Sequence, residues 1–317
     1  MHNDHISLPV SARRSAGQLF RSASIYRHPR RPRYERAAQP PALRLTPRDI
    51  AILQAVADYQ LLRRDQIQAL FFPSVRTCVR ALARLYHHAY LDRLRPYVLW
   101  GTGDSPAIYT LDRKGTALLV GLGDAVTFRR KETEIRSLFL HHALAVNDVR
   151  IAVTRAVQIG GMALAQWLTE REFLQRPDTV EMETADGTRR RRQIRPDAFF
   201  VIRQQFYTSR FLLEVDLATE DNPRFGRDKV KPGLLYLKSA AYKQRFGYNS
   251  GRWLVVTTSE KRLHNLKHQT EAVAGRAASV FYFTTFAQVS PATILTAPIW
   301  RRGGETTLRP LLRQSDV

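Results

Sequence analysis

Two apolar runs, IRPDAFFVI at residues 194–202 and FLLEVDLATED at residues 211–221, decide the fold of the second half of this chain. In the second run, the apolar residues Phe211, Leu213, Val215 and Leu217 alternate with Leu212, Glu214 and Asp216. This period of two predicts a β-strand, and its parity places Glu214 and Asp216 on one face, roughly 6–7 Å apart. If the first run pairs with it in antiparallel fashion, Asp197 lies beside them.

The surrounding pattern alternates between helices and strands. A long helix is expected over residues 131–157, followed by strands over 163–173, 193–202 and 210–219, a helix over 232–246, a strand over 252–259, a helix over 260–275 and a strand over 279–286. This order predicts a mixed sheet covered by helices over residues 131–290, with a C-terminal tail over 291–317.

The acids of the two runs have two interpretations. Asp197, Glu214 and Asp216 could simply face water. Converging at the end of a sheet, however, they would offer hard oxygen ligands that suit Mg²⁺ or Mn²⁺. Such an ion could polarise a phosphodiester and activate a water molecule.

The first part of the chain is basic. Residues 1–43 carry eight arginines against two acids, which predicts a flexible basic arm. Three helical patterns follow, over residues 45–62, 63–72 and 74–91, with Thr46 and Ser74 as capping residues and Pro47 in the first turn. Strands over 91–100 and 106–111 and a helix over 112–120 complete a winged helix-turn-helix over residues 44–123.

The third helix of this unit has two contrasting faces. Its apolar set is expected to be buried: Val75, Cys78, Val79, Leu82, Leu85, Tyr86 and Tyr90. Its polar set would enter the major groove of DNA: Arg76, Thr77, Arg80, Arg84 and His87. A second basic group, Arg189, Arg190, Arg191 and Arg192, falls in an expected turn and is either an exposed tip or a grip on phosphates.

Composition points to the same partner. The net charge is +22 and the sequence pI is about 10.8, which favours a polyanion. No run approaches the ~20 apolar residues of a membrane-spanning helix, so no membrane partner is expected. The single cysteine, Cys78, indicates a reducing cytoplasm. Double-stranded DNA is the predicted partner, and a homodimer or contacts with replication and transfer proteins remain open.

Three polar residue types receive structural interpretations. His142 is expected to be a satisfied core histidine on the long helix, and Asp148 a solvated acid. Tyr236 and Tyr242 are expected to fill a core.

The motif RPDAFF followed by LLEVD, in this order of elements, resembles the PD-(D/E)XK nucleases, whose fold is that of restriction endonucleases. Asp197 matches the motif aspartate and Glu214 the second acid. Asp216 stands where the family has a lysine that positions or activates the attacking water. The resemblance therefore implies cleavage only if Lys229, Lys231 or Lys238 supplies the amine from another part of the chain.

The chain over residues 43–290 also resembles the bacterial replication-relaxation family of plasmids and integrative elements. The resemblance is carried by LTPRDIAILQAVADYQLLRRDQIQALFF (residues 45–72), HHALAVNDVR (residues 141–150), the RPD and EVD motifs and VVTTSEKR (residues 255–262). It implies a DNA-binding protein of a mobile element that acts in replication, relaxation or DNA processing.

Two functions stay open. One is a Mg²⁺-dependent endonuclease or nickase that uses Asp197, Glu214, Asp216 and Lys229. The other is a non-catalytic winged-helix transcriptional regulator or accessory factor, which needs no cofactor.

Overall fold

The structure is a computed structural model that describes residues 34–94, 106–126, 137–183, 187–218 and 222–312. Contacts divide the chain into residues 1–36 and residues 37–317. Of the first unit only residues 34–36 are described, so the basic arm expected for residues 1–43 lies mostly outside the described residues. The described helices and strands all lie in the second unit.

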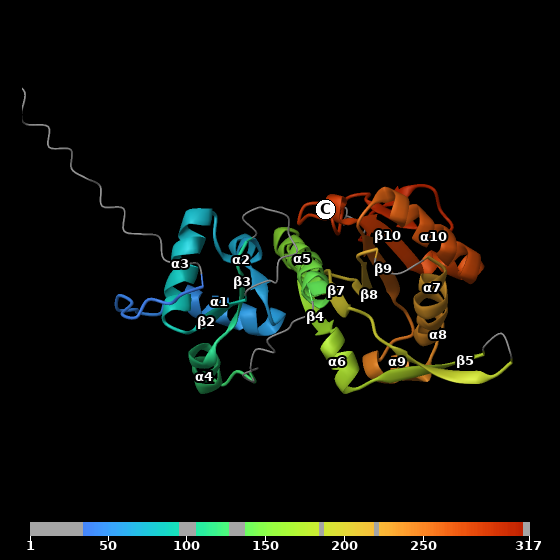
Figure 1. Cartoon of the computed structure of the whole chain (residues 1–317). Coiled ribbons are helices and arrows are strands. Elements are labelled where there is room, and N and C mark those ends of the chain that lie inside the picture. Colours follow the sequence, from blue (N-terminus) through green and yellow to red (C-terminus); the bar gives the residue numbers. More distant parts are fainter. Residues whose placement is uncertain (1–33, 95–105, 127–136, 184–186, 219–221, 313–317) are drawn as a thin grey trace, which may run out of the picture. The chain divides into compact units, whose positions relative to one another are not determined.

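Its first part contains four helices and a small sheet (Figure 1): α1 (Pro47–Tyr59), β1 (Leu62–Arg63), α2 (Arg64–Phe71), α3 (Val75–His87), β2 (Leu91–Leu94), β3 (Ile108–Leu111) and α4 (Arg113–Gly121). Helix α1 begins at a capping box. Thr46 Oγ1 accepts the N–H of Asp49 at 3.2 Å, and Asp49 Oδ2 accepts the N–H of Thr46 at 2.9 Å. Ser74 caps α3. These side chains satisfy N–H groups that have no partner within the helix, so both helices begin where the sequence predicts.

The small sheet has the order β1-β3-β2, with both pairs antiparallel. Strands β2 and β3 were expected, although residues 95–105 between them lie outside the described residues. Strand β1 was not expected, because it is only two residues long. Helices α1–α3 and this sheet enclose one apolar core, to which α5 contributes Ile151.

The apolar face predicted for α3 is partly wrong. Cys78, Leu82 and Leu85 are fully buried, but the side chains of Val75 and Val79 are 48% and 41% exposed. These valines lie at the edge of the apolar stripe, where nothing in the described residues covers them fully.

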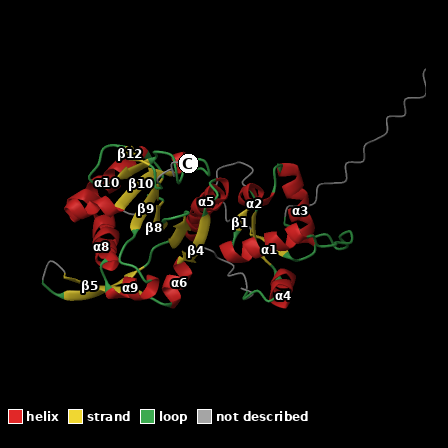
Figure 2. Ribbon diagram, turned by 180° about the vertical axis from the view of Figure 1, so that it is seen from behind, coloured by secondary structure: helices red, strands yellow, loops and turns green. Residues whose placement is uncertain are grey.

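The second part is built on a seven-stranded mixed sheet of order β12-β11-β10-β9-β8-β7-β4 (Figures 1 and 2). The strands are β4 (Ala163–Thr169), β7 (Ala198–Arg203), β8 (Thr208–Asp216), β9 (Arg252–Thr257), β10 (Phe281–Thr285), β11 (Trp300–Arg302) and β12 (Leu308–Arg309). Strands β8, β9 and β10 are parallel, whereas β7 and β4 add in antiparallel fashion on one side and β11 and β12 on the other. A mixed α/β architecture is therefore confirmed.

The two faces of the sheet have separate cores. Helix α5 (Ser137–Ile159) packs on one face, together with residues from the C-terminal segment. The other face is covered by α6 (Glu170–Gln175), α7 (Asn222–Phe225), a π-helical turn (Gly226–Val230), α8 (Lys231–Leu237), α9 (Ala240–Phe246) and α10 (Glu260–Ala274). Two 3₁₀ turns, Gly275–Val280 and Phe286–Gln288, flank β10. Tyr236 and Tyr242 are fully buried, so the structural interpretation of both is confirmed.

Several predicted boundaries are corrected. The strand expected to reach residue 173 ends at Thr169, where α6 begins. The arginine run is not a turn but strand β6 (Arg189–Ile194), which pairs with β5 (Asp178–Glu183) in a two-stranded ribbon. The helix expected over residues 232–246 is divided into α8 and α9.

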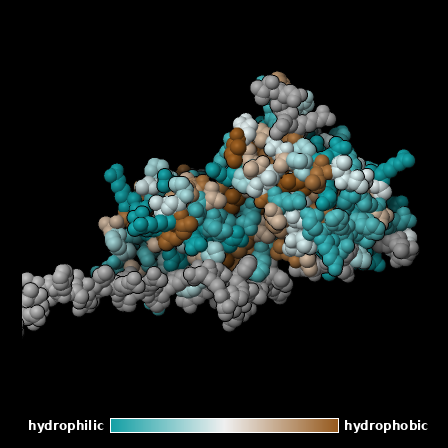
Figure 3. Space-filling model, turned by 90° about the horizontal axis from the view of Figure 1, so that it is seen from above, coloured by the Kyte–Doolittle hydropathy of each residue, from teal (hydrophilic) through white to brown (hydrophobic). Residues whose placement is uncertain are grey.

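The segment from residue 291, expected to be a tail, carries β11 and β12 and completes the sheet. Trp300 is fully buried in this segment, and its Nε1 donates to Ile294 O at 2.8 Å. Among the described helices, none combines the length and the apolar character needed to cross a membrane. On the side seen in Figure 3, hydrophilic residues surround separate hydrophobic patches.

Candidate functional site

The candidate site lies at the carboxyl end of β8. All six residues of this strand from Phe211 to Asp216 are buried. Phe211, Leu213 and Val215 join the core on the α5 face, whereas Leu212 joins the core on the opposite face. Because side chains alternate between the two faces along a strand, Glu214 and Asp216 lie on the same face as Leu212, opposite α5. A buried carboxylate is costly unless it has a partner, so the neighbours of these acids define the site.

Glu214 is paired with a lysine from another segment. Lys229, in the π-helical turn, places Nζ 2.5 Å from Glu214 Oε1. The other carboxylate oxygen, Oε2, is buried and has no hydrogen-bond partner in the part of the chain that the structure describes. Burial raises the pKa of Glu214, while the charge of Lys229 opposes this rise. The carboxyl group thus has one oxygen held by a cation and one oxygen available to a ligand.

Asp197 lies directly before β7, where antiparallel pairing brings it beside the end of β8. Its Oδ2 accepts the N–H of Val215 at 2.6 Å. His142 of α5 places Nε2 3.3 Å from Asp197 Oδ2 and 3.2 Å from Val215 O. His142 was expected to be a satisfied core histidine; its ring is hydrogen-bonded as expected, but the side chain is 33% exposed and meets an acid of the site from the other face of the sheet.

The surroundings of His142 favour its charged form. Burial lowers its pKa, but the hydrogen bond and charge of Asp197, together with the charge of Glu214, raise the pKa of His142 to about 9. His142 therefore acts as a cation that partly neutralises the two acids.

Glu170 is a further acid that the sequence analysis missed. It is the first residue of α6, and its backbone N–H donates to Asp197 O at 3.1 Å. Burial, and then the negative charge of Asp197, raise the pKa of Glu170, against the charges of His142, Lys229 and Arg195. The capping-box spacing of Thr169 and Glu172 could have indicated that a helix starts at Glu170.

Asp216 does not join this group. Its Oδ2 accepts from Thr257 Oγ1 at 2.6 Å and from Arg262 Nε at 2.9 Å, and its Oδ1 accepts from Arg262 Nη2 at 2.8 Å. Both carboxylate oxygens are therefore engaged by side chains of β9 and α10. Asp216 was predicted to be a metal ligand and catalytic acid, but its carboxylate forms a bidentate ion pair with Arg262, so we leave it out of the candidate site.

Two carboxylates, those of Asp197 and Glu214, are the groups that could bind a hard divalent cation here; Asp216 is not a third. The observation that fits such an ion is the buried Oε2 of Glu214, which no described residue hydrogen-bonds, near the carboxylate of Asp197. Carboxylate oxygens are the ligands that Mg²⁺ and Mn²⁺ prefer. In the ranges that the structure describes, no group of three or more His, Cys, Asp and Glu side chains is arranged to hold a metal ion.

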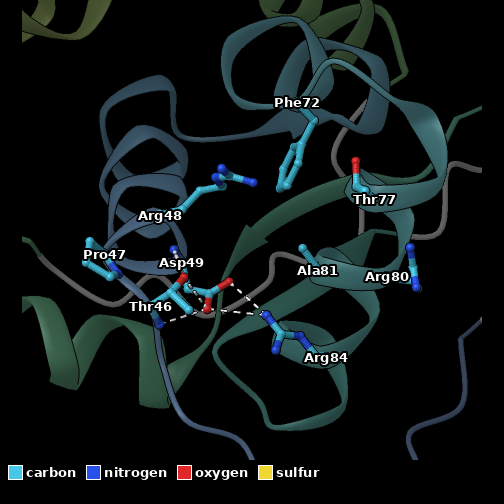
Figure 4. A pocket seen from close by; sticks show the side chains of 9 residues that line it. All are labelled: Thr46, Pro47, Arg48, Asp49, Phe72, Thr77, Arg80, Ala81 and Arg84. Carbon is cyan, nitrogen blue, oxygen red and sulfur yellow. Dashed lines mark hydrogen bonds and ion pairs between the residues drawn. The ribbon is translucent and has the colours of Figure 1, made fainter.

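A second candidate surface lies on α3. Arg76, Thr77, Arg80 and Arg84 are all exposed, as expected. Three of them line a groove of about 730 Å³ between α3 and the first turn of α1 (Figure 4). Arg76 does not line this groove. The groove thus presents an arginine-rich wall that is open to solvent.

Arg48 and Asp49 complete the groove, and neither was foreseen as part of this surface. Arg48 points toward Phe72, with its guanidinium 5.3 Å from the ring centroid (Figure 4). Asp49 is buried and contacts Arg84 Nη2 at 3.4 Å, so it removes part of the positive charge. His87 is only partly exposed and accepts the N–H of Ala37 at Nδ1, which ties it to the segment before α1.

The four predicted arginines of β6, Arg189 to Arg192, are exposed along the ribbon. Asp148, expected to be solvated, instead accepts hydrogen bonds from Arg63 Nη2 at 2.9 Å and Gln66 Nε2 at 2.7 Å. This acid therefore joins α5 to α2 and is not part of the acid site.

Comparison with curated proteins gave no match. Among solved structures, the restriction endonuclease FokI matches with a TM-score of 0.23 and 11% identity, over 77% of this chain and 43% of that chain. FokI bound to DNA matches with a TM-score of 0.21 and 11% identity, over 78% of this chain and 45% of that chain. This chain spans less than half the length of either. The model of the replication-relaxation family matches residues 53–232, more than half of the chain. The chain therefore belongs to the replication-relaxation family.

Proposed function

We propose that this chain binds double-stranded DNA and cleaves or nicks its phosphodiester backbone at the site formed by Asp197, Glu214 and Lys229. The observation that carries this proposal is the contact of Lys229 with Glu214. The sequence lacks the motif lysine, since Asp216 occupies that position. The amine of Lys229, in the π-helical turn, lies instead beside Glu214, the second acid of the motif. This is the position that a lysine supplied from another segment must reach.

The roles follow from the contacts. Lys229 Nζ would donate to the attacking water and offset the negative charge that builds up as the phosphate is attacked. His142 and the N–H of Val215 hold the Asp197 carboxylate in a fixed orientation. Asp197 and Glu214 would hold Mg²⁺ or Mn²⁺, which supplies polarisation of the phosphodiester when bound.

We propose that DNA is held by a winged helix-turn-helix at residues 44–123. The support is the order of three helices followed by two antiparallel strands, with α3 exposing Arg76, Thr77 and Arg80. Arginine suits both guanine edges and phosphates. Residues from 131 onward would form the PD-(D/E)XK-like domain, which extends beyond residue 290 because β11 and β12 complete its sheet.

Membership of the replication-relaxation family leads us to propose a role in the replication, relaxation or processing of plasmid or integrative-element DNA, in the cytoplasm. Partners would be a second copy of the chain or the replication and transfer proteins of the element.

One alternative has an observation in its favour. His142 already supplies a cation to Asp197, so the acids could serve only to stabilise the sheet. The chain would then be a non-catalytic transcriptional regulator or accessory factor that holds DNA without a cofactor.

Nicking of supercoiled plasmid during Mg²⁺ and Mn²⁺ titration separates these functions. We expect metal-dependent nicking that is lost in Asp197→Asn, Glu214→Gln and Lys229→Met. Lys231→Met is the matched control, since Lys231 lies two residues further on, is exposed, and donates to Glu183 O at 3.2 Å. Salt-sensitive DNA binding without nicking at any metal concentration would refute the catalytic proposal and favour the alternative.

A further inference from the structure

The β5–β6 ribbon distributes its four arginines over two faces. Residues directly opposite each other in an antiparallel pair share a face. On one face the arginines oppose acids, as Glu183 with Arg189 and Glu181 with Arg191. On the other they oppose buried apolar residues, as Met182 with Arg190 and Val180 with Arg192.

These two faces differ in charge. Arg191 Nε lies 3.7 Å from Glu181 Oε1, and both side chains are largely exposed. The face of Arg189 and Arg191 is thus close to neutral. On the opposite face, the one acid of β5, Asp178, is paired with Arg245 of α9, and Arg192 reaches Asp228 in the π-helical turn.

The carboxylate of Asp228 contacts three guanidinium groups. Besides Arg192, it contacts Arg224 Nε at 3.4 Å and Arg227 Nε at 3.1 Å. Three guanidinium groups thus surround one carboxylate. The arginine side chains keep 49%, 56% and 65% of their surface exposed, so a polyanion can reach them.

The carboxylate at the centre stays ionised. Burial acts to raise the pKa of Asp228, but the hydrogen bond from Arg227 and the charge of Arg192 outweigh it and hold the pKa below its usual value. An ionised Asp228 keeps the guanidinium groups together against their mutual repulsion.

Two arginines of this cluster, Arg192 and Arg224, line the same cleft as the candidate catalytic pair, whereas Arg227 does not line it. A cleft of about 200 Å³ is bordered by Arg192, Arg224 and Asp228, and also by Glu214 and Lys229. Glu214 is only 7% exposed where it lines this cleft, and its Oε2 has no hydrogen-bond partner among the described residues. A group held at the arginines would therefore lie next to Glu214 and to the amine of Lys229.

We propose that Arg192, Arg224 and Arg227, arranged by Asp228, bind backbone phosphates of one DNA strand and so position the neighbouring phosphodiester at Glu214 and Lys229. This inference rests on the proposed function. The guanidinium fork matches phosphate geometry and does not lose its charge. Asp228 is a positioning residue, since it acts on the phosphates only through the arginines.

Binding of a fluorescein-labelled DNA duplex, followed by anisotropy in EDTA over a series of NaCl concentrations, tests the cluster. We expect Arg192→Gln and Arg224→Gln each to weaken binding by about fivefold or more and to reduce the salt slope by about one. The matched control is Arg191→Gln, a neighbour of the same type on the neutral face, which should change affinity by less than about twofold. Equal weakening by Arg191→Gln and Arg192→Gln, or none by Arg192→Gln and Arg224→Gln, would overturn the proposal.

Asp228→Asn gives a sharper result, because two explanations predict opposite signs. If Asp228 only adds a repelling charge, its removal strengthens binding. If it arranges the arginines, its removal weakens binding, and we expect about a threefold loss or more. Stronger binding by this variant, with an unchanged urea midpoint, would refute its positioning role.

Failure of this inference is distinguishable from failure of the proposed function. The anisotropy assay contains no divalent metal and needs no cleavage, so the cluster can be supported even if the plasmid is never nicked. Conversely, metal-dependent nicking with affinities unchanged in Arg192→Gln and Arg224→Gln would refute the cluster and leave the catalytic proposal standing.

Discussion

The ion pair of Asp216 with Arg262 allows a test of why two acids follow each other on one buried strand face. Asp216→Ala removes three hydrogen bonds, two of them from the guanidinium of Arg262, whose side chain is only 12% exposed. Removing one partner of a buried pair typically costs about 3–5 kcal/mol. In thermal unfolding this corresponds to a decrease in Tm of roughly 6–20 °C.

Urea unfolding followed by tryptophan fluorescence measures the loss in free energy of unfolding and reports on the seven-stranded sheet. Trp167, Trp253 and Trp300 all lie on strands of the seven-stranded sheet. We expect Asp216→Ala and Arg262→Met each to lower the free energy of unfolding by about 3–5 kcal/mol.

The double variant Asp216→Leu/Arg262→Met should lose far less than the sum of the single losses, because a well-packed apolar pair can replace a buried ion pair at little cost. If it folds, it should keep metal-dependent nicking, since Asp216 is not proposed as a ligand. A loss below about 1 kcal/mol in both single variants would show that this pair does not stabilise the sheet. Loss of nicking in a folded double variant would return Asp216 to the catalytic site.

Three further predictions concern the first part of the chain. Gly115→Ala should unfold at lower urea concentration than Gly121→Ala on the same helix, because a Cβ at Gly115 would lie 2.2 Å from Tyr90 O whereas one at Gly121 meets nothing within 4 Å; equal midpoints would contradict this. Cys78 should react slowly with a thiol reagent at pH 8, because burial raises its pKa to about 11 and leaves roughly one thiol in a thousand ionised, and urea should accelerate the reaction; rapid reaction in the folded protein would refute it. Thr46→Ala should cost about 1 kcal/mol of stability through loss of the capping box, measured by circular dichroism during urea unfolding, and no measurable cost would show that α1 does not depend on it.

Local patterns of the sequence were enough to predict the elements that carry the acids. The strict alternation after Phe211 predicts that Glu214 and Asp216 share a face. Glu214 is paired with Lys229 and Asp216 with Arg262, both from segments that cover that face. The capping residues Thr46 and Ser74 likewise mark helix starts without any knowledge of tertiary contacts.

The partners of the acids could not be predicted, because they depend on contacts between distant segments. Arg262 lies 46 residues beyond Asp216, and His142 approaches from the opposite face of the sheet. An apolar helical stripe indicates that His142 is buried, but it does not show which polar group the ring meets. Glu170 was missed because the strand before it was extended too far.

The arginine run shows the limit of composition as a guide. Four consecutive arginines resemble an exposed turn, yet opposing glutamates on β5 let them form a regular strand. Their alternation then gives neighbouring arginines different surroundings, which a count of charges does not reveal.

The separation of Asp216 from its partner also bears on the order in which the chain folds. During synthesis β8 emerges well before Arg262, so a nascent chain that ends before this residue would hold a buried carboxylate with no cation beside it. We expect the centre of the sheet to close only after α10 has been made, and a chain truncated at residue 259 to leave the amide protons of β8 unprotected from hydrogen exchange. Asp216 thus delays assembly of this end of the sheet until β9 and α10 are both present.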